Sequence, residues 1–298
     1  MKFGKVTNPE LLNLKLPQDH IDTAAVLKKV TVNSNLNVSV GCAKWNKQDL
    51  KNFYPKGTKD KLKYYASQFN SIELNATFYR IFPAEQYQKW YDKTPEDFKF
   101  YPKITNEVSH LNRLNNNVYP ILDRYLQATS TLKEKLGTIF LQLHTNFDTK
   151  EWYKVVQFVK YWPKEFKLAI EFRHPDWFAN KTIAQELYYL LQENNIANTI
   201  VDTAGRRDLL HMRLTNNEAF VRFVGANHKS DYDRLEEWTT RLENWKEKGL
   251  KNIHFFVHQN MELESPLLSA SFIASLNKKV DSNLKIPKTL LDNRLTLF

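Results

Sequence analysis

The sequence predicts a single-domain α/β fold, in which eight parallel strands alternate with helices. Three observations lead to this prediction: short apolar runs recur along the chain, amphipathic segments with helical spacing separate them, and no linker interrupts the alternation. Eight such units within about 260 residues are the count and size of a β/α barrel. A doubly wound open sheet is the alternative.

The predicted strands are short runs rich in apolar, β-branched and aromatic residues. The fifth of them, in "KLAIEFRHPDWF", changes from apolar to charged after Ile170. Side chains alternate along a strand, so Glu171 and Arg173 share one face. Leu168, Ile170 and Phe172 then face the helices. The eight strands are expected at residues 37–41, 71–75, 98–103, 138–144, the first part of 167–178, 196–202, 219–225 and 252–258.

The predicted helices have apolar residues at helical spacing and recognisable start and stop signals. An apolar stripe begins at Val118 and stops at Gly137, and Asp148 with Glu151 forms a start that resembles a capping box. The helices are expected at residues 59–69, 84–93, 118–136, 148–160, 182–194, before Gly249 and at 266–276.

The domain prediction places one barrel at residues 37–280. Residues 1–36 are expected to form an N-terminal extension packed on the barrel, and residues 281–298 a C-terminal tail. No internal repeat or Pro/Ser-rich hinge indicates a second domain.

The composition excludes several classes of protein. The chain has 298 residues, of which 42% are hydrophobic, so it can bury a large core. Its 7 glycines include no dinucleotide-binding or Walker A pattern, and its single Cys42 excludes an intramolecular disulfide. No apolar run reaches the roughly 18 residues of a membrane span, and no signal peptide is recognisable. We therefore expect a cytoplasmic protein without a membrane partner.

The formal net charge is +10, and a lysine-rich segment lies early in the chain. One interpretation of this segment is a surface for phosphates or nucleic acid, and the other is an ordinary solvated face. Lysine carries the charge rather than arginine, which disfavours bidentate recognition of phosphate or guanine. The segment runs from Lys44 to Lys63 and contains Lys44, Lys47, Lys51, Lys56, Lys59, Lys61 and Lys63 against Asp49 and Asp60.

Polar residues gather at the carboxyl ends of the predicted strands, where a β/α barrel places its active site. We expect Glu171 to be the general acid or base and Glu73 to be the second catalytic carboxylate. Lys103, Arg173 and Arg222 are suited to an anionic ligand. An ion pair between Glu171 and Arg173 is the structural alternative. The full set of predicted ligand-binding residues is Asn75, Lys103, Gln142, His144, Arg173, His174, Asp202, Arg222 and Asn260.

Two other chemistries are weaker alternatives. A glycosidase would need Glu73 and Glu171 close together, whereas the second and fifth strands of an eight-stranded ring are expected to lie far apart. A divalent metal is a further alternative, but no close-spaced ligand motif supports it and the arginines at the mouth would repel a cation. The sequence predicts no cofactor. The metal ligands in that alternative would be Glu73, His144, Glu171, Asp202 and His258.

Several motifs occur together in the order seen in a known family. They are "FNSIELNATFYRIFPAEQYQKWYDKTPEDFKFYPKITNEVSH", "LGTIFLQLHTNF", "LAIEFRHPDWF" and "VDTAG", over roughly residues 40–260. Together they resemble the YecE-like family, whose domain is called domain of unknown function seventy-two. The resemblance implies a β/α barrel of the triosephosphate-isomerase (TIM) type and no established reaction.

The chain departs from the family pattern in two places. The first strand continues as "VGCAKW" where the family usually has "G-T-S-G-W", and the last ends in "FVHQN" where an asparagine pair is usual. These departures leave the roles of Cys42, Lys44, His258 and Gln259 open. We expect Cys42 to be inert, because no base lies near it in the sequence.

The resulting functional prediction is an enzyme, or a degenerate enzyme, that binds a small phosphorylated, carboxylated or polar metabolite at the mouth of the barrel. Hydrolase, lyase and isomerase chemistry are not distinguished. The alternatives are a nucleic-acid-binding or processing protein that uses the Lys44 to Lys63 segment, and a noncatalytic barrel that senses a ligand. Arg206 and Arg207, in the loop after the sixth strand, are further candidates for an anion site.

Overall fold

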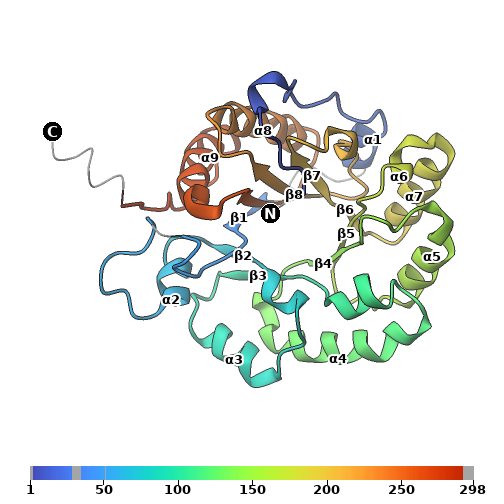
Figure 1. Ribbon diagram of the computed structural model, residues 1–298, viewed down its shortest axis with the longest axis horizontal. Helices are drawn as coiled ribbons and strands as arrows, with labels where there is room; N and C mark the ends of the chain where they lie inside the picture. The colour runs from blue at the N-terminus through green and yellow to red at the C-terminus, as the bar shows by residue number, and fades with distance from the viewer. Residues whose placement is uncertain (1–2, 29–34, 51, 291–298) are drawn as a thin grey trace.

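Parallel strands lie at the centre of the molecule and helices surround them (Figure 1). The computed structural model describes residues 3–28, 35–50 and 52–290. Its strands are β1 (Asn37–Cys42), β2 (Ser71–Leu74), β3 (Lys99–Pro102), β4 (Ile139–Gln142), β5 (Leu168–Glu171), β6 (Ala197–Asn198), β7 (Ile200–Thr203), β8 (Glu218–Gly225) and β9 (Asn252–Gln259). Its α-helices are α1 (Thr23–Lys28), α2 (Lys61–Ala66), α3 (Ala84–Asp92), α4 (Tyr119–Thr129), α5 (Trp152–Tyr161), α6 (Asp176–Ala179), α7 (Lys181–Glu193), α8 (Ser230–Glu247) and α9 (Ser265–Val280).

The strands form three sheets, with the orders β1-β9-β8-β7, β2-β3 and β4-β5-β6, and every paired strand is parallel. The predicted parallel α/β architecture is therefore confirmed. In the part of the chain that the structure describes, the hydrogen-bonded pairing does not close into one ring. An isolated bridge between Lys103 and Phe140 links the end of β3 to β4.

The sixth predicted strand is divided in two. The Asn198 N–H bonds to Oγ1 of Thr215, and the Thr199 N–H bonds to the Ile170 carbonyl. These bonds keep β6 beside β5, whereas β7 pairs with β8. The break therefore separates two of the sheets.

Two predicted helices are shorter than expected, and two helices were not predicted. Helix α2 begins after Asp60, whose side chain accepts a hydrogen bond from the Lys63 N–H and caps the helix. Helix α4 ends at Thr129 and is followed by 3₁₀ turns, within which Lys133 has a φ of 49°. Helices α1 and α6 lie in stretches for which no helix was expected.

The strands present one apolar face inward and another toward the helices. Leu168, Ile170 and Phe172 pack in the outer core, as the alternation of the fifth strand predicts. Ala169 points the other way, where a small side chain leaves room for its aromatic neighbours. We call its group the inner apolar cluster; it consists of Tyr101, Phe140, Ala169, Ala197, Phe220 and Phe256.

The described part of the N-terminal region packs on the strands and on α8. The Leu16 N–H bonds to the Glu237 carboxylate, and Asp19 pairs with Arg241. The predicted extension at residues 1–36 and tail at 281–298 also include residues 1–2, 29–34 and 291–298, which lie outside the described residues. No helix in the described part of the chain is long and apolar enough to cross a membrane. A cytoplasmic location stays a prediction.

Candidate functional site

Six buried polar side chains lie together at the carboxyl ends of the strands. Five of them each follow a member of the inner apolar cluster by two residues, and the sixth, Glu73, follows Ser71 of β2 by two residues. The alternation of a strand therefore places them on the inner face, one layer nearer to the mouth. We call them the inner polar cluster: Glu73, Lys103, Gln142, Glu171, Arg222 and His258.

Arg222, on β8, is the centre of this cluster. Its Nε and Nη2 donate to the two oxygens of Glu73, both at 2.8 Å, and its Nη1 donates to Oε2 of Glu171. The bidentate geometry fixes the guanidinium plane against Glu73. Although burial opposes the charge, Glu171 and Glu73 raise the pKa of Arg222. Both glutamates therefore bind the same cation.

Glu171 also binds Arg173 and Gln142. Nε of Arg173 donates to Oε1 of Glu171, and the Gln142 amide donates to both carboxylate oxygens at 3.0 Å. Burial would raise the pKa of Glu171, but Arg173 and Arg222 lower it to about 2. The local ion pair considered as the structural alternative is thus present, and a second arginine extends it.

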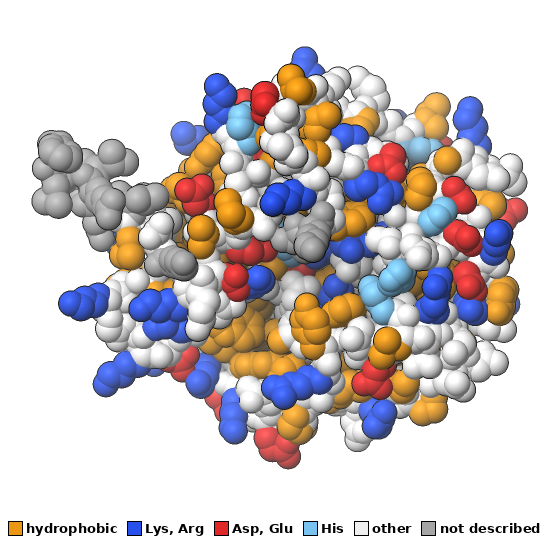
Figure 2. Space-filling model, viewed as in Figure 1, with side chains coloured by type: hydrophobic (Ala, Val, Ile, Leu, Met, Phe, Trp, Pro, Cys, Tyr) orange, Lys and Arg blue, Asp and Glu red, His pale blue; other side chains and the backbone are white. Residues whose placement is uncertain are grey.

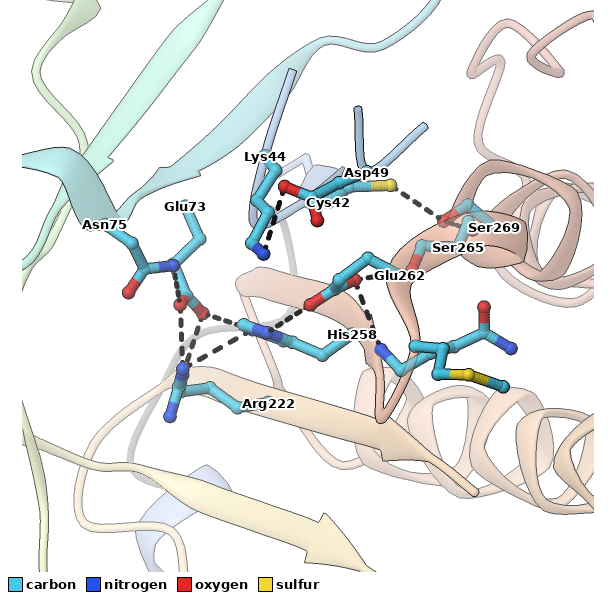
Figure 3. Close-up of polar contacts among 12 residues, drawn as sticks. Cys42, Lys44, Asp49, Glu73, Asn75, Arg222, His258, Glu262, Ser265 and Ser269 are labelled. Carbon is cyan, nitrogen blue, oxygen red and sulfur yellow. Dashed lines mark hydrogen bonds and ion pairs between the residues drawn. The ribbon is translucent and has the colours of Figure 1, made fainter. Parts of the chain in front are cut away.

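His258 lies between two carboxylates, from β2 and from the turn after β9 (Figure 3). Its Nε2 is 2.9 Å from Oε2 of Glu73, and its Nδ1 is 3.6 Å from Oε1 of Glu262. Burial alone would lower the pKa of His258, but Glu73 and Glu262 raise it. Burial likewise opposes ionisation of Glu73, and Arg222 and His258 hold its pKa well below the usual value. His258 is therefore suited to carry a proton at neutral pH.

Lys103 follows β3 and is 7% exposed. Its Nζ donates to Oε1 of Gln142 at 2.7 Å and lies 3.9 Å from the centre of the Phe78 ring. Burial, followed by the charges of Arg222 and Arg173, lowers the pKa of Lys103 to about 7. The amine is therefore charged in only part of the molecules at neutral pH.

A cavity of about 560 Å³ opens beside the inner polar cluster. Figure 2 views this face and shows recessed hydrophobic side chains among Lys and Arg side chains. In Figure 3, Lys44 and Asp49 lie on the other side of His258 and Glu262 from Arg222. We call this space the mouth cavity; its lining is Ala43, Lys44, Trp45, Asn46, Asp49, Asn75, Ala76, Phe78, Tyr79, Lys103, His258 and Glu262.

Most of the predicted site residues meet at this end of the strands. Asn75 lines the cavity and its amide donates to Glu73 at 2.7 Å. His144 lies beside the cluster, with its ring 5.1 Å from that of His110. His174 lies farther out, before α6, and its Nδ1 accepts from the Asp176 N–H. Asn260 follows β9, and its backbone N–H bonds to the Gly225 carbonyl.

Asp202 was predicted to bind a ligand, and the structure places it elsewhere. It is fully buried and its carboxylate faces α8, where it accepts hydrogen bonds from Arg234 at 2.7 Å and from Trp238 at 2.8 Å. Arg207 binds the same carboxylate, so this arginine is also directed away from the mouth cavity. Asp202 therefore occupies the position of β7 that points outward and does not line the mouth cavity, and its binding of a ligand stays an untested prediction.

Glu73 and Glu171 were expected to lie far apart, but in the structure both carboxylates bind the guanidinium of Arg222. Long side chains from distant strands meet at the centre of the mouth, a point that strand order alone does not indicate. The five residues of the metal alternative are not assembled, since Asp202 pairs with α8. Among the described residues, no group of three or more His, Cys, Asp or Glu has an arrangement that could hold a metal ion.

The predicted catalytic and ligand-binding set did not include several residues at the mouth, among them His258, which was predicted only as a ligand in the metal alternative. His258 shares a face with His254 and Phe256 in "NIHFFVH", so the alternation contained the signal. Burial, together with Lys103 and His144, lowers the pKa of His110 to about 4. The Phe3 ring lies 4.0 Å from the guanidinium of Arg173. No local pattern marks Phe3, because its partner is remote in sequence.

The lysine-rich segment lies next to the mouth cavity. Lys44 pairs with Asp49 at 3.1 Å, and Lys51 lies outside the described residues. A second cavity, of about 580 Å³, shares Trp45 with the first; its lining is Trp45, Lys59, Asp60, Lys61, Leu62, Gln86, Lys89, Trp90 and Lys93.

Cys42, which is expected to be inert, and Trp177, which follows the fifth strand, are both buried. Cys42 is buried, and burial raises the pKa of its thiol. Trp177 is buried and its indole N–H donates to the Phe147 carbonyl at 2.7 Å. Neither side chain lines the mouth cavity.

Known proteins with similar sequences have no assigned activity in their names. The UPF0759 protein YecE of Escherichia coli K12 is 26% identical over 245 residues, which are 76% of this chain and 89% of YecE. The UPF0759 protein YunF of Bacillus subtilis is 28% identical over 201 residues, which are 64% of this chain and 71% of YunF.

Solved structures of DUF72 family proteins have a fold similar to that of this chain. A DUF72 family protein from Enterococcus faecalis V583 has a TM-score of 0.65 at 17% identity, over 84% of this chain and 99% of the other. A DUF72 family protein from Thermotoga maritima has a TM-score of 0.63 at 21% identity, over 83% of this chain and 100% of the other. The family model described as "Protein of unknown function DUF72" matches residues 39–291, and the chain therefore belongs to the DUF72 family.

Proposed function

We propose that this protein binds a small polar or anionic metabolite in the mouth cavity and catalyses a reaction that needs proton transfer. The observation that carries the proposal is the position of Lys103, an amine with a pKa of about 7, in the wall of a 560 Å³ cavity. A general acid or base works best when its pKa is near the working pH. His258 and Glu262 line the same cavity.

The two glutamates receive a different role from the one that the sequence predicted. Their carboxylates are fully buried and bound to Arg222, and the pKa of Glu171 falls to about 2. A base with so low a pKa is nearly always ionised and weakly basic. We therefore assign Glu73 and Glu171 to positioning Arg222, His258 and Gln142, and Lys103 to proton transfer.

A second proposal concerns the arrangement of the strands. We propose that the three sheets are arcs of one TIM-type barrel over residues 37–280, with extensions at residues 1–36 and 281–298. Support comes from the inner apolar cluster, which draws on all three sheets, and from the bridge between Lys103 and Phe140. An experimental structure in which β2 does not pair with β1 and β6 does not approach β8 would oppose this arrangement.

A thermal-shift screen of phosphorylated and carboxylated metabolites tests the proposed function. A cavity ligand should raise the unfolding temperature of the wild-type protein, because a ligand that binds only the folded state stabilises it. The shift should be lost in Lys103→Met and retained in Lys164→Met, whose lysine is exposed and distant in sequence from the cavity lining. A ligand that stabilises all three proteins equally would refute the assignment of the site.

Binding of nucleic acid is a second candidate function, and the lysine-lined second cavity favours it. Lys59, Lys61 and Lys89 surround Trp45 and Trp90 there, and an aromatic ring among basic side chains suits a stacked base. Oligonucleotide binding should then weaken steeply as salt rises from about 50 to 200 mM. If oligonucleotides do not bind at low salt, this candidate is eliminated.

A further inference from the structure

Among the residues that the structure describes, two lysines are buried, and their environments differ. Nζ of Lys135 donates to the carbonyls of Tyr91 and Thr94 at 2.7 Å, and to Oγ1 of Thr94 at 3.3 Å. Three acceptors satisfy the three hydrogens of an ammonium group. Among the described residues, Lys103 has one hydrogen-bond acceptor, Oε1 of Gln142, and it lines a cavity. Lys135 is therefore built as a structural cation, and Lys103 is not.

The surroundings of Lys103 favour a neutral amine. Burial is the largest cause that disfavours the charged amine, and the charges of Arg222 and Arg173 add to it. The Phe78 ring, whose centre is 3.9 Å from Nζ, acts in the opposite direction because an aromatic face attracts a cation. A neutral amine has a free electron pair, and desolvation beside other cations is a known way of making a lysine nucleophilic. Facing a cavity, such an amine is suited to attack an electrophilic carbon.

We propose that Lys103 forms an imine with the carbonyl carbon of a small aldehyde or ketone that also carries a carboxylate or phosphate group. This inference rests on the proposed function, because it names the class of metabolite that the mouth cavity binds. The volume of about 560 Å³ is ample for such a compound. Lys44, in the same wall, is the candidate partner of the anionic group.

The step balances without an oxidant or reductant. The electron pair of Nζ forms a bond to the carbonyl carbon, the carbonyl oxygen takes a proton, and the nitrogen loses one. The carbon–oxygen bond of this carbinolamine then breaks, one water leaves, and a protonated carbon–nitrogen double bond remains. Addition of water reverses the sequence and returns the free amine.

Neighbouring groups can supply and stabilise the charges. His258, whose pKa is raised by Glu73 and Glu262, lines the cavity with Lys103 and is the candidate proton donor to the departing hydroxyl. The iminium nitrogen is positive, and Glu171 and Glu73 offset part of the effect by which burial and the two arginines disfavour a charge at this position. Gln142 connects Lys103 to Glu171 through its two amide atoms and so holds the amine in place.

The first test measures the reactivity of each lysine in the wild-type protein. The protein is treated at pH 7 with formaldehyde and cyanoborohydride, and the extent of methylation is followed by peptide mass spectrometry. An ordinary lysine, with a pKa near 10.4, is neutral in roughly one molecule in 2,500 at this pH. We expect Lys103 to react at least about tenfold faster than exposed lysines such as Lys164, and Lys135 to react more slowly than they do. Equal or slower reaction of Lys103 overturns the inference.

The second test asks which carbonyl compounds are trapped. Pyruvate provides a carboxylate and dihydroxyacetone phosphate a phosphate, and borohydride converts the imine formed into a stable adduct. We expect an adduct on Lys103 with at least one of them, which Lys103→Met loses and Lys164→Met keeps. Trapping of neither compound on Lys103 overturns the inference.

The proposed function has a separate readout. If an anionic metabolite stabilises the wild type but not Lys103→Met, and Lys103 is not trapped, the imine is wrong and the cavity still binds the metabolite. If no metabolite stabilises the protein and Lys103 is not trapped, both proposals fail. Trapping is measured on the wild type, so it does not depend on the folding of any variant.

Discussion

Replacement of Arg222 by methionine should destabilise the protein strongly, because Arg222 holds two buried carboxylates. It binds both oxygens of Glu73 at 2.8 Å and also binds Glu171, and all three side chains are at most 1% exposed. Breaking a buried ion pair costs about 3–5 kcal/mol, since the remaining charge has no partner. We expect the free energy of unfolding at pH 7 to fall by about this amount.

The pH dependence makes this prediction more specific. In the wild type the pKa of Glu171 is lowered to about 2, so its stabilising contribution is present above the unfolded pKa of about 4.3 and is lost as the pH falls below it. In the variant, burial without Arg222 should raise the pKa of the carboxylates. The variant therefore gains stability on protonation, and its deficit should be smaller at pH 5 than at pH 7.

Urea denaturation at both pH values, followed by tryptophan fluorescence, measures the two differences. Arg124→Met is the matched control, because Arg124 is exposed on α4, and it should change the stability by less than about 0.5 kcal/mol. A loss below about 1 kcal/mol for Arg222→Met, or a deficit that grows toward pH 5, would refute the reasoning.

Three further variants test other parts of the structure. Lys103→Met should increase the free energy of unfolding, and more so at pH 6.5 than at pH 10: the folded pKa of about 7 lies below the unfolded value near 10.4, so the wild type gains stability as the pH rises between them. Urea denaturation at both pH values checks this, and an equal gain at both would contradict it. Asp202→Asn should lower the free energy of unfolding by about 3–5 kcal/mol in the same assay, because the buried Arg234 on α8 loses its charged partner. Any cavity ligand should still produce its thermal shift, and loss of that shift would show that Asp202 does act at the mouth. Gly4→Ala should increase cleavage of the N-terminal segment in limited proteolysis. Gly4 has a φ of 71°, and an added Cβ would lie 2.1 Å from Oγ1 of Thr203. Unchanged cleavage would mean that the contact between Gly4 and Thr203 does not hold the segment.

The sequence predicts the inner face of the fold well, because that face depends on the alternation of side chains along each strand. Glu73, Gln142, Glu171 and Arg222 lie where the alternation places them. The two-residue spacing from Phe220 to Arg222 needs no knowledge of tertiary contacts. Local periodicity therefore accounts for most of the inner polar cluster.

The features that the sequence does not predict depend on contacts between distant segments. The break between β6 and β7 involves Thr215, and the outward direction of Asp202 is stabilised by Arg234 and Trp238 of α8. Phe3 reaches Arg173 across most of the chain. Such contacts have no local signature. They decide which charged residues at the ends of the strands remain available to a ligand.

The pairing within the inner polar cluster explains why Lys103 is its adjustable member. Arg222 is bound to two carboxylates, which raises its own pKa and lowers those of Glu73 and Glu171. His258 is held between Glu73 and Glu262, and these carboxylates raise its pKa. The opposite charges thus fix one another in their ionised forms. Lys103 has a neutral amide as its hydrogen-bond acceptor, and burial, followed by the charges of Arg222 and Arg173, lowers its pKa to about 7. A ligand that brings a negative charge or a carbonyl carbon to the cavity would change the state of Lys103 first, because the other charges already have partners.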